Sequence, residues 1–346
     1  MRPTKLAQRG PRRPRQTKSL RSGLRLGAAV IASGALATTA ALTLSAAADA
    51  STSANGSSHY TFRTLNNAHD LTFNQLLGIN NNGHIAGYFG SGVAGHPNKG
   101  YLLRPPYGSQ KQYQNVNFPH SKQTQVTGLN DLGVQVGFFS TQNKANNINN
   151  NFGWYLKNGR FHEVNFPTSD PASPPVDQLL GVNNHDVAVG FYVDGQGNNH
   201  GYEYNIIVKR FSRVLKPGDS GASLQATGIN DRGDVAGIYV TKGGVTDGFL
   251  KYSNGRFVTL AVKGATMTQA FGVNNRDEVV GTYQTGTGSN AKTFGFTWRA
   301  GHGFTTISDP HGVGTTLING VNNEGDLVGF YTDAAGNVDG MLALPK

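Results

Sequence analysis

A twelve-residue motif that recurs six times constrains the fold of this chain more than any other feature. The copies follow one another at spacings of 50, 53, 47, 44 and 48 residues. A period of this size, filled with short runs of β-type pattern, is typical of a propeller blade of four strands. The copies are GINNNGHIAGYF from Gly78, GLNDLGVQVGFF from Gly128, GVNNHDVAVGFY from Gly181, GINDRGDVAGIY from Gly228, GVNNRDEVVGTY from Gly272 and GVNNEGDLVGFY from Gly320.

The motif itself is predicted to be a β-hairpin. Strand a enters the motif and strand b leaves it, and the turn between them has the pattern N-[ND]-x-[GD]. Asparagine at such a turn can hydrogen-bond its own backbone, and the fourth position needs a positive φ. Asp186 and Asp277 replace glycine at that position, which is tolerable because Asp enters the left-handed region more readily than most residues.

Two further strands complete each copy. Strand c carries a large residue after a glycine, and strand d carries an aromatic residue with an aliphatic one three positions later, as in Phe161 and Val164. No long amphipathic helix follows residue 50, so the folded part is predicted to be all-β. The predicted core residues of strand c are Tyr101, Trp154, Tyr202, Phe249, Phe296 and Met341.

The two ends of the chain complement each other. The sixth copy ends after strand c in DGMLALPK, whereas HYTFRTLNN before the first copy contains Phe62 and Leu65 at the strand d spacing. The N-terminal strand, residues 60–65, is therefore predicted to pair with residues 341–344 and to close a ring without open edges. The prediction is an all-β fold, a six-bladed β-propeller of four-stranded blades, in one domain over residues 59–346.

The N-terminus predicts export. Nine Lys or Arg residues and one acid precede residue 51, followed within that segment by an Ala-rich apolar stretch with A-x-A spacing, so residues 1–50 are interpreted as a secretory signal peptide. An uncleaved membrane anchor is the alternative. Residues 51–58 are interpreted as a polar linker. The rest of the chain holds 21 basic and 19 acidic residues, so the net charge of +10 gives no basic patch for nucleic acid.

The repeat resembles the extracellular HAF-family repeat, whose signature centres on G-[IV]-N-[ND]-x-G-x-[VIA]-[VA]-G. The match extends over residues of about 60 to 346 and is closest from Gly228 and Gly320. The resemblance implies a secreted bacterial protein, a β-propeller of unassigned biochemical activity. It brings no catalytic residues.

The loops predict where a ligand would bind. By strand direction the b–c and d–a loops share one face, and their lengths vary, whereas the a–b turn has a fixed length. Insertions collected on one face suggest a binding surface. We therefore expect a secreted, monomeric, non-enzymatic propeller that binds an extracellular polysaccharide, the cell wall or a protein, with no nucleic acid and no membrane contact after signal removal. The alternatives are a lyase or glycosidase with a loop-built acid/base site at the channel mouth, and a purely structural surface protein.

Few residues stand out as candidates for a site. Five copies have glutamine three residues before the motif glycine, and this amide ring at the channel mouth is predicted to bind ligand, with structural hydrogen bonds as the alternative. Trp298 is a candidate sugar-stacking residue, with simple packing as its alternative. No cysteine, metal pattern, nucleophile signature or cofactor motif is present, although a site built from His96, His200 and Asp194 stays open. The candidate glutamines are Gln75, Gln125, Gln178, Gln225 and Gln269.

Overall fold

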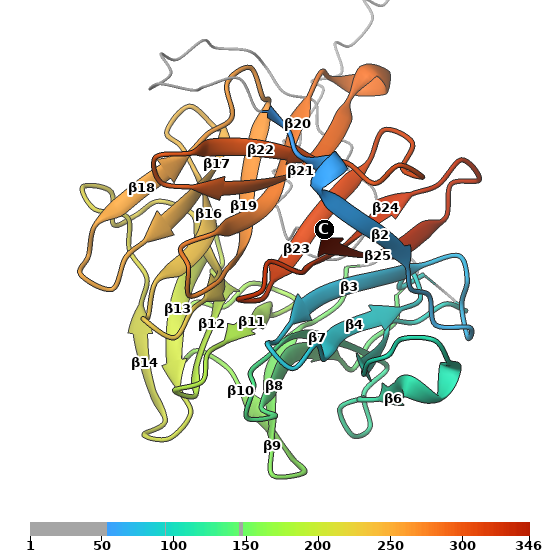
Figure 1. Cartoon of the computed structure of the whole chain (residues 1–346). Helices are drawn as coiled ribbons and strands as arrows, with labels where there is room; N and C mark the ends of the chain where they lie inside the picture. Colours follow the sequence, from blue (N-terminus) through green and yellow to red (C-terminus); the bar gives the residue numbers. More distant parts are fainter. Residues whose placement is uncertain (1–53, 94, 145–147) are drawn as a thin grey trace, which may run out of the picture.

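The chain forms a ring of six sheets. The computed structural model describes residues 54–93, 95–144 and 148–346, and within them the sheets surround a central axis (Figure 1). This is the predicted six-bladed β-propeller. The segment interpreted as a signal peptide lies outside the described residues. The described helices are three short 3₁₀ turns, none of which has the length and apolarity needed to span a membrane.

In each blade the four main strands are antiparallel, and the first of them lies next to the first strands of the neighbouring blades, around the axis. Blade 1 consists of β3 (Asn74–Ile79), β4 (Ile85–Phe89), β5 (Lys99–Leu103) and β6 (Tyr113–Asn115), and blade 2 of β7 (Gln123–Leu129), β8 (Gln135–Ser140), β9 (Phe152–Lys157) and β10 (Arg160–Val164). Blade 3 consists of β11 (Asp177–Val182), β12 (Val187–Val193), β13 (Asn199–Asn205) and β14 (Arg210–Arg213), and blade 4 of β15 (Leu224–Ile229), β16 (Val235–Val240), β17 (Thr246–Lys251) and β18 (Phe257–Leu260).

The last two blades include strands from the N-terminus. Blade 5 consists of β19 (Met267–Val273), β20 (Val279–Thr285), β21 (Lys292–Arg299), β22 (Gly303–Ile307) and the short β1 (Ala54–Asn55), and blade 6 of β23 (Thr316–Val321), β24 (Leu327–Thr332), β25 (Val338–Pro345) and β2 (Tyr60–Thr64). The 3₁₀ turns are η1 (Ser57–His59), η2 (Gln110–Gln112) and η3 (Gly288–Asn290).

Ring closure follows the prediction. Strand β2 pairs antiparallel with β25, from Tyr60 opposite Pro345 to Thr64 opposite Met341. Figure 1 shows this blue strand beside the red C-terminal one. The end of the segment interpreted as a linker also joins the propeller, because β1 pairs parallel with β22. Strand β2, near the start of the described chain, and the C-terminal strand β25 therefore share blade 6, and no blade is left with three strands.

The first glycine of the motif marks the closest approach of neighbouring blades. A Cβ atom on Gly128 would lie 2.7 Å from the carbonyl oxygen of Leu180, and at the six equivalent glycines this distance runs from 2.6 to 3.1 Å. The pairing of strands a and b shifts register at the same place, as between Leu179 and Gly181. Any side chain here would push the inner strands apart, so glycine is required by packing.

The predicted strand c residues fill the spaces between blades. All six are fully buried, at 0 % exposure. Trp154, for example, packs with Val126 and Phe139 of its own blade and with Ala86 and Leu102 of blade 1. Burial of one such side chain is worth about 1.5–3 kcal/mol, and each interface exists only when its neighbouring blade is present. The hydrophobic core thus consists of the interfaces between neighbouring blades, which follow one another around the ring.

The turn chemistry also follows the prediction. The fourth position of the motif turn has a positive φ in every blade, between 73° and 89° at the four glycines. Asp186 and Asp277 adopt φ values of 57° and 60° there. The substitution of Asp for Gly is thus accommodated in the left-handed region without a change of turn.

Candidate functional site

The first asparagine of the motif turn ties each blade to the next. The Oδ1 atom of Asn183 accepts hydrogen bonds from the backbone N–H groups of His185 and Val187, both at 3.0 Å. Its Nδ2 atom donates across the blade boundary to the carbonyl oxygen of Asn230, at 3.0 Å. This position must accept and donate at once, which an Asp side chain cannot do when ionised. The same donation joins all six blades, through Asn80, Asn130, Asn183, Asn230, Asn274 and Asn322.

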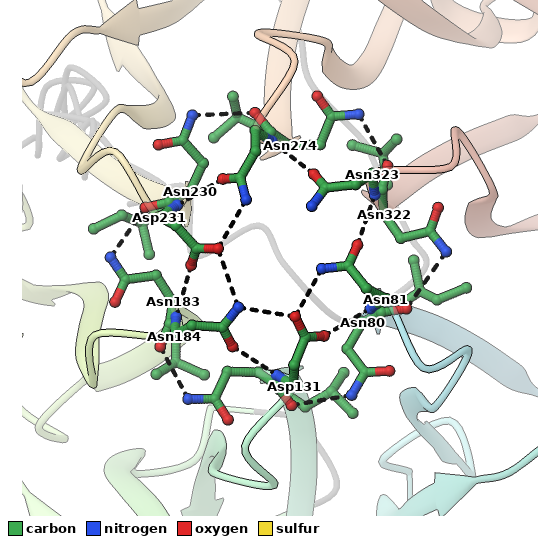
Figure 2. Close-up of a pocket in the computed structure, with 18 residues that line it drawn as sticks. Asn80, Asn81, Asp131, Asn183, Asn184, Asn230, Asp231, Asn274, Asn322 and Asn323 are labelled. Carbon is green, nitrogen blue, oxygen red and sulfur yellow. Dashed lines mark hydrogen bonds between the residues drawn. The ribbon is translucent and has the colours of Figure 1, made fainter.

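A second ring lies beside the first. The side-chain oxygen of the next residue accepts the backbone N–H of its counterpart in the preceding blade, at 2.8–2.9 Å in all six cases. Only an acceptor is needed here, so Asn and Asp both occur. Figure 2 shows the two rings around the axis. The second ring consists of Asn81, Asp131, Asn184, Asp231, Asn275 and Asn323.

These rings surround a cavity of about 90 Å³ at the channel mouth formed by the a–b turns. Two carboxylates face it, and the Asn184 amide donates to both, at 2.8 Å to Asp131 and 3.0 Å to Asp231. Burial raises the pKa of Asp231, but hydrogen bonds from Asn275 and Asn184 outweigh it and hold the pKa below its usual value. An ionised, saturated carboxylate suits water or a small polar group and does not suit general acid catalysis.

The channel is narrow beyond this mouth. On the other side of the glycine ring a cavity of about 30 Å³ is lined by the residues that precede the motif glycines. Its polar members are held by the neighbouring blades: the Thr127 hydroxyl donates to the carbonyl of Leu179, and the Asn319 amide to that of Leu76. The lining residues are Leu77, Thr127, Leu180, Thr227, Phe271 and Asn319.

The predicted glutamine ring lies on strand a, away from both of these cavities. All five glutamines are buried, at 2–5 % exposure. Gln125 donates to the Oδ1 atom of Asn98 in the preceding blade at 2.9 Å, and the Tyr88 hydroxyl donates to Gln75 at 2.8 Å. Gln178 reaches Asn151 of blade 2 at 3.3 Å. These contacts support the structural alternative, and the ligand-binding role stays a prediction.

The other candidates are dispersed. Trp298 lies half-buried in blade 5, opposite Val279 and 6.5 Å from the ring of Phe304, which is a packing environment. His200 and Asp194 are brought together, with Nε2 and Oδ2 2.8 Å apart. His96 pairs instead with Asp70, at 2.9 Å. The His96, His200 and Asp194 site is therefore not assembled, and no cluster of three His, Asp or Glu side chains able to hold a metal occurs among the described residues.

Sequence reasoning missed an outer groove between blades 2 and 3. Its volume is about 530 Å³, and it lies at the c–d turns, which share a face with the a–b turns. The groove is absent from the repeat pattern because it is built by two unlike hairpins, one of two loop residues and one of four. The apolar stretch Ile206 to Val208 in a turn was the available signal. The lining residues are Tyr155, Lys157, Asn158, Arg160, His162, Ile206 and Ile207.

Exposed aliphatic side chains concentrate on the opposite, loop-rich face. Six of the nine large hydrophobic residues that are most exposed lie in b–c or d–a loops, at 38–61 % exposure. They come from loops distributed around the ring. We call them the aliphatic crown: Leu71, Val93, Ile148, Leu215, Val245 and Val313.

Comparisons with known proteins give a distant likeness in fold. No family model matches the sequence, and no curated protein matches it, so the resemblance to the HAF repeat stays a prediction. A polysaccharide lyase, an ulvan lyase, is similar at 12 % identity and a TM-score of 0.40, over 76 % of this chain and 77 % of its own. A six-bladed fucose-recognising lectin from Aleuria aurantia is similar at 9 % identity and a TM-score of 0.42, over 70 % and 78 %.

A mutant of AofleA from Arthrobotrys oligospora has 12 % identity and a TM-score of 0.42, over 72 % of this chain and 75 % of its own. At such values none of these matches bears on the ligand of this chain or on its residues.

Proposed function

We propose that this protein is a secreted, non-catalytic propeller that binds an extracellular polymer through its loop-rich face. The observation that carries the proposal is the aliphatic crown. Exposed aliphatic residues scattered singly are ordinary on a protein surface, so the informative feature is the concentration of six of the nine on one face of the ring. Six at one end of the ring, all in loops on a scaffold tied together by hydrogen bonds, suit a partner that covers several blades.

The chemistry of the crown favours a protein segment over a glycan as the ligand. Carbohydrate sites depend on polar groups that fix orientation, and aromatic side chains supply amphipathic contact area. The crown instead consists of Leu, Val and Ile side chains. Loops on the same face carry charges of both signs: Lys216 and Asp219 share a loop with Leu215, and Lys122 and Asp170 lie in neighbouring d–a loops. Protein interfaces combine apolar side chains with polar ones in this way.

The carboxylates at the mouth formed by the a–b turns do not suit general acid catalysis, and the acid/base site of the lyase or glycosidase alternative would lie at the opposite mouth, among the b–c and d–a loops. A general acid needs a raised pKa, whereas hydrogen bonds lower the pKa of Asp231. Secretion remains a proposal that rests on the basic and apolar leader, residues 1–50, and on the resemblance to an extracellular repeat.

The proposal is tested by binding of the purified protein to an array of short random peptides and to a glycan array. A triple variant, Leu71→Asn, Leu215→Asn and Val313→Asn, removes half of the crown. Its matched control, Leu132→Asn, Ile207→Asn and Val208→Asn, makes the same kind of change at the three exposed aliphatic residues of the other face.

We expect the crown variant to lose peptide binding by about tenfold or more, because truncation of central apolar contacts costs about 1–2 kcal/mol or more each. The control should bind peptides as the wild type does. The proposal is refuted if both variants lose binding equally, if the protein binds only glycans, or if the crown variant binds peptides as tightly as the wild type does. Melting curves of both variants verify that each remains folded.

A further inference from the structure

The outer groove between blades 2 and 3 has the composition of a site for an anionic sugar chain. Its volume of about 530 Å³ falls within the range of ligand pockets. One wall comes from the hairpin that joins β9 to β10 and the other from the hairpin that joins β13 to β14. It lies on the face opposite the aliphatic crown, so it is independent of the surface proposed above.

The blade 2 wall carries basic side chains and a stacked pair of rings. The His162 ring stacks on Tyr155, with centroids 4.6 Å apart and planes 13° from parallel, and His162 is exposed while Tyr155 is buried beneath it. Lys157 is held by Asp186 of blade 3. Arg160 is exposed and makes no ion pair with any described residue. The groove thus offers an exposed imidazole beside a guanidinium that lacks an anion.

The geometry of this wall is fixed by local structure. Asn158 and Gly159 form a two-residue hairpin turn with φ values of 52° and 72°, the positive pair that matches strand twist. Arg160 and His162 follow on one side of β10, since side chains alternate along a strand. His162 lies opposite Tyr155 in the strand register, which explains their stacking. No loop has to be ordered to present the two side chains.

The blade 3 wall is aliphatic and equally fixed. Ile207 is 62 % exposed, yet its backbone N–H donates to the Oδ1 atom of Asn205 at 3.0 Å, which holds the turn. Ile206 is anchored by a bond from its N–H to the carbonyl of Asp186 at 2.9 Å. A ligand between the walls would meet an apolar edge on one side and a ring and cations on the other.

We propose that this groove binds an acidic polysaccharide, with Arg160 pairing with a carboxylate or sulfate and the His162 ring lying against a sugar ring. Guanidinium groups recognise planar carboxylates with two parallel hydrogen bonds, and sulfate in a similar way. The residues that line the groove include Lys157 and Arg160 and no carboxylate, so the local charge favours an anion even though Lys157 pairs with Asp186 nearby. The aromatic and aliphatic walls distinguish this site from a purely electrostatic patch.

The test measures binding of the purified protein to polygalacturonate and to dextran sulfate, with neutral dextran and poly-glutamate alongside. The variants are Arg160→Gln and His162→Ala. The matched control is Arg256→Gln, which removes a basic side chain near the same turn in blade 4, where it lies over the Tyr252 ring and outside the groove.

We expect at least one acidic glycan to bind and neutral dextran not to bind. Arg160→Gln should weaken that binding by about tenfold or more, as for loss of a charged hydrogen bond. His162→Ala should weaken binding of the acidic glycan and leave binding of poly-glutamate unchanged. Arg256→Gln should bind as the wild type does. Binding of neither acidic glycan, equal loss in Arg256→Gln, or poly-glutamate binding as tight as that of the glycans would overturn the proposal.

Discussion

The inter-blade role of the first motif asparagine gives the sharpest prediction for stability. Asn183→Ala removes three hydrogen bonds: two backbone N–H groups of the turn lose their acceptor, and the carbonyl of Asn230 in the next blade loses the Asn183 amide while it retains the N–H of Gly233. The residue is 5 % exposed, so water cannot replace these partners freely. At about 0.5–1.5 kcal/mol per bond, the loss in the free energy of unfolding should be about 2–4 kcal/mol.

Asn183→Asp separates the two contributions. The carboxylate can still accept from His185 and Val187, but it cannot donate to Asn230, so we expect an intermediate loss of about 1–2 kcal/mol. His185→Ala, at the exposed third position of the same turn, is the matched control and should change stability by less than about 0.5 kcal/mol.

Equilibrium unfolding in urea, with melting curves in parallel, measures these differences; one kcal/mol corresponds to about 2–4 °C in a domain of this size. If Asn183→Ala and His185→Ala have the same free energy of unfolding, or if Asn183→Asp is as stable as the wild type, the inter-blade bond contributes nothing to stability and the prediction is wrong.

Three further predictions follow from burial and packing. Burial raises the pKa of Asp177 to about 7 from 3.8, so its folded form holds a proton that the unfolded chain releases. This group should lower the stability of the wild type by at most about 4 kcal/mol as pH rises from about 4 to 7, and Asp177→Asn should make the slope in urea titrations at several pH values clearly smaller; an unchanged slope would contradict the assignment. Gly128→Ala should destabilise by about 1–3 kcal/mol or more because its Cβ meets the neighbouring blade, whereas Gly108→Ala, with open space around it, should leave the melting temperature unchanged. Gln178→Ala should lose about 1 kcal/mol of stability and keep ligand binding intact; lost binding at unchanged stability would instead support the glutamine ring as a site.

The strands and the ring closure could be predicted because they depend on local patterns that repeat. Tyr60 opposite Pro345 follows from a missing strand d at one end and an extra one at the other. The burial of Trp154 follows from its place after the strand c glycine. Both are consequences of period and alternation, which a single sequence displays directly.

The inter-blade bonds could have been inferred from the identity of the turn residues. The first position is Asn in all six copies, although Asp would accept the turn's N–H groups equally well. Asn in all six copies therefore indicates that this side chain must also donate a hydrogen bond, and in the structure it donates to the next blade. The second position is Asn in four copies and Asp in two because the inter-blade bond at this position needs only an acceptor.

The groove and the crown could not be predicted in this way. The groove depends on Arg160 and Ile207, which lie 47 residues apart on unlike hairpins and share no repeated pattern. The crown depends on the exposure of side chains such as Val313, which lies in a d–a loop outside the repeated motif. Such features arise where the repeats differ from one another, so the repeat period of the sequence does not predict them.

An engineered disulfide tests most directly whether β2 and the C-terminal strand β25 share one blade and so close the ring. The chain has no cysteine, so Thr61→Cys combined with Leu344→Cys introduces one pair, at positions directly opposite in the β2 and β25 register. Air oxidation of the folded protein should join the pair, as seen by mass spectrometry and faster migration on a non-reducing gel. Thr61→Cys with Leu132→Cys, in a turn of blade 2, should stay reduced. A free first pair in the folded protein, or equal oxidation of both pairs, would contradict a ring closed by the N-terminal strand.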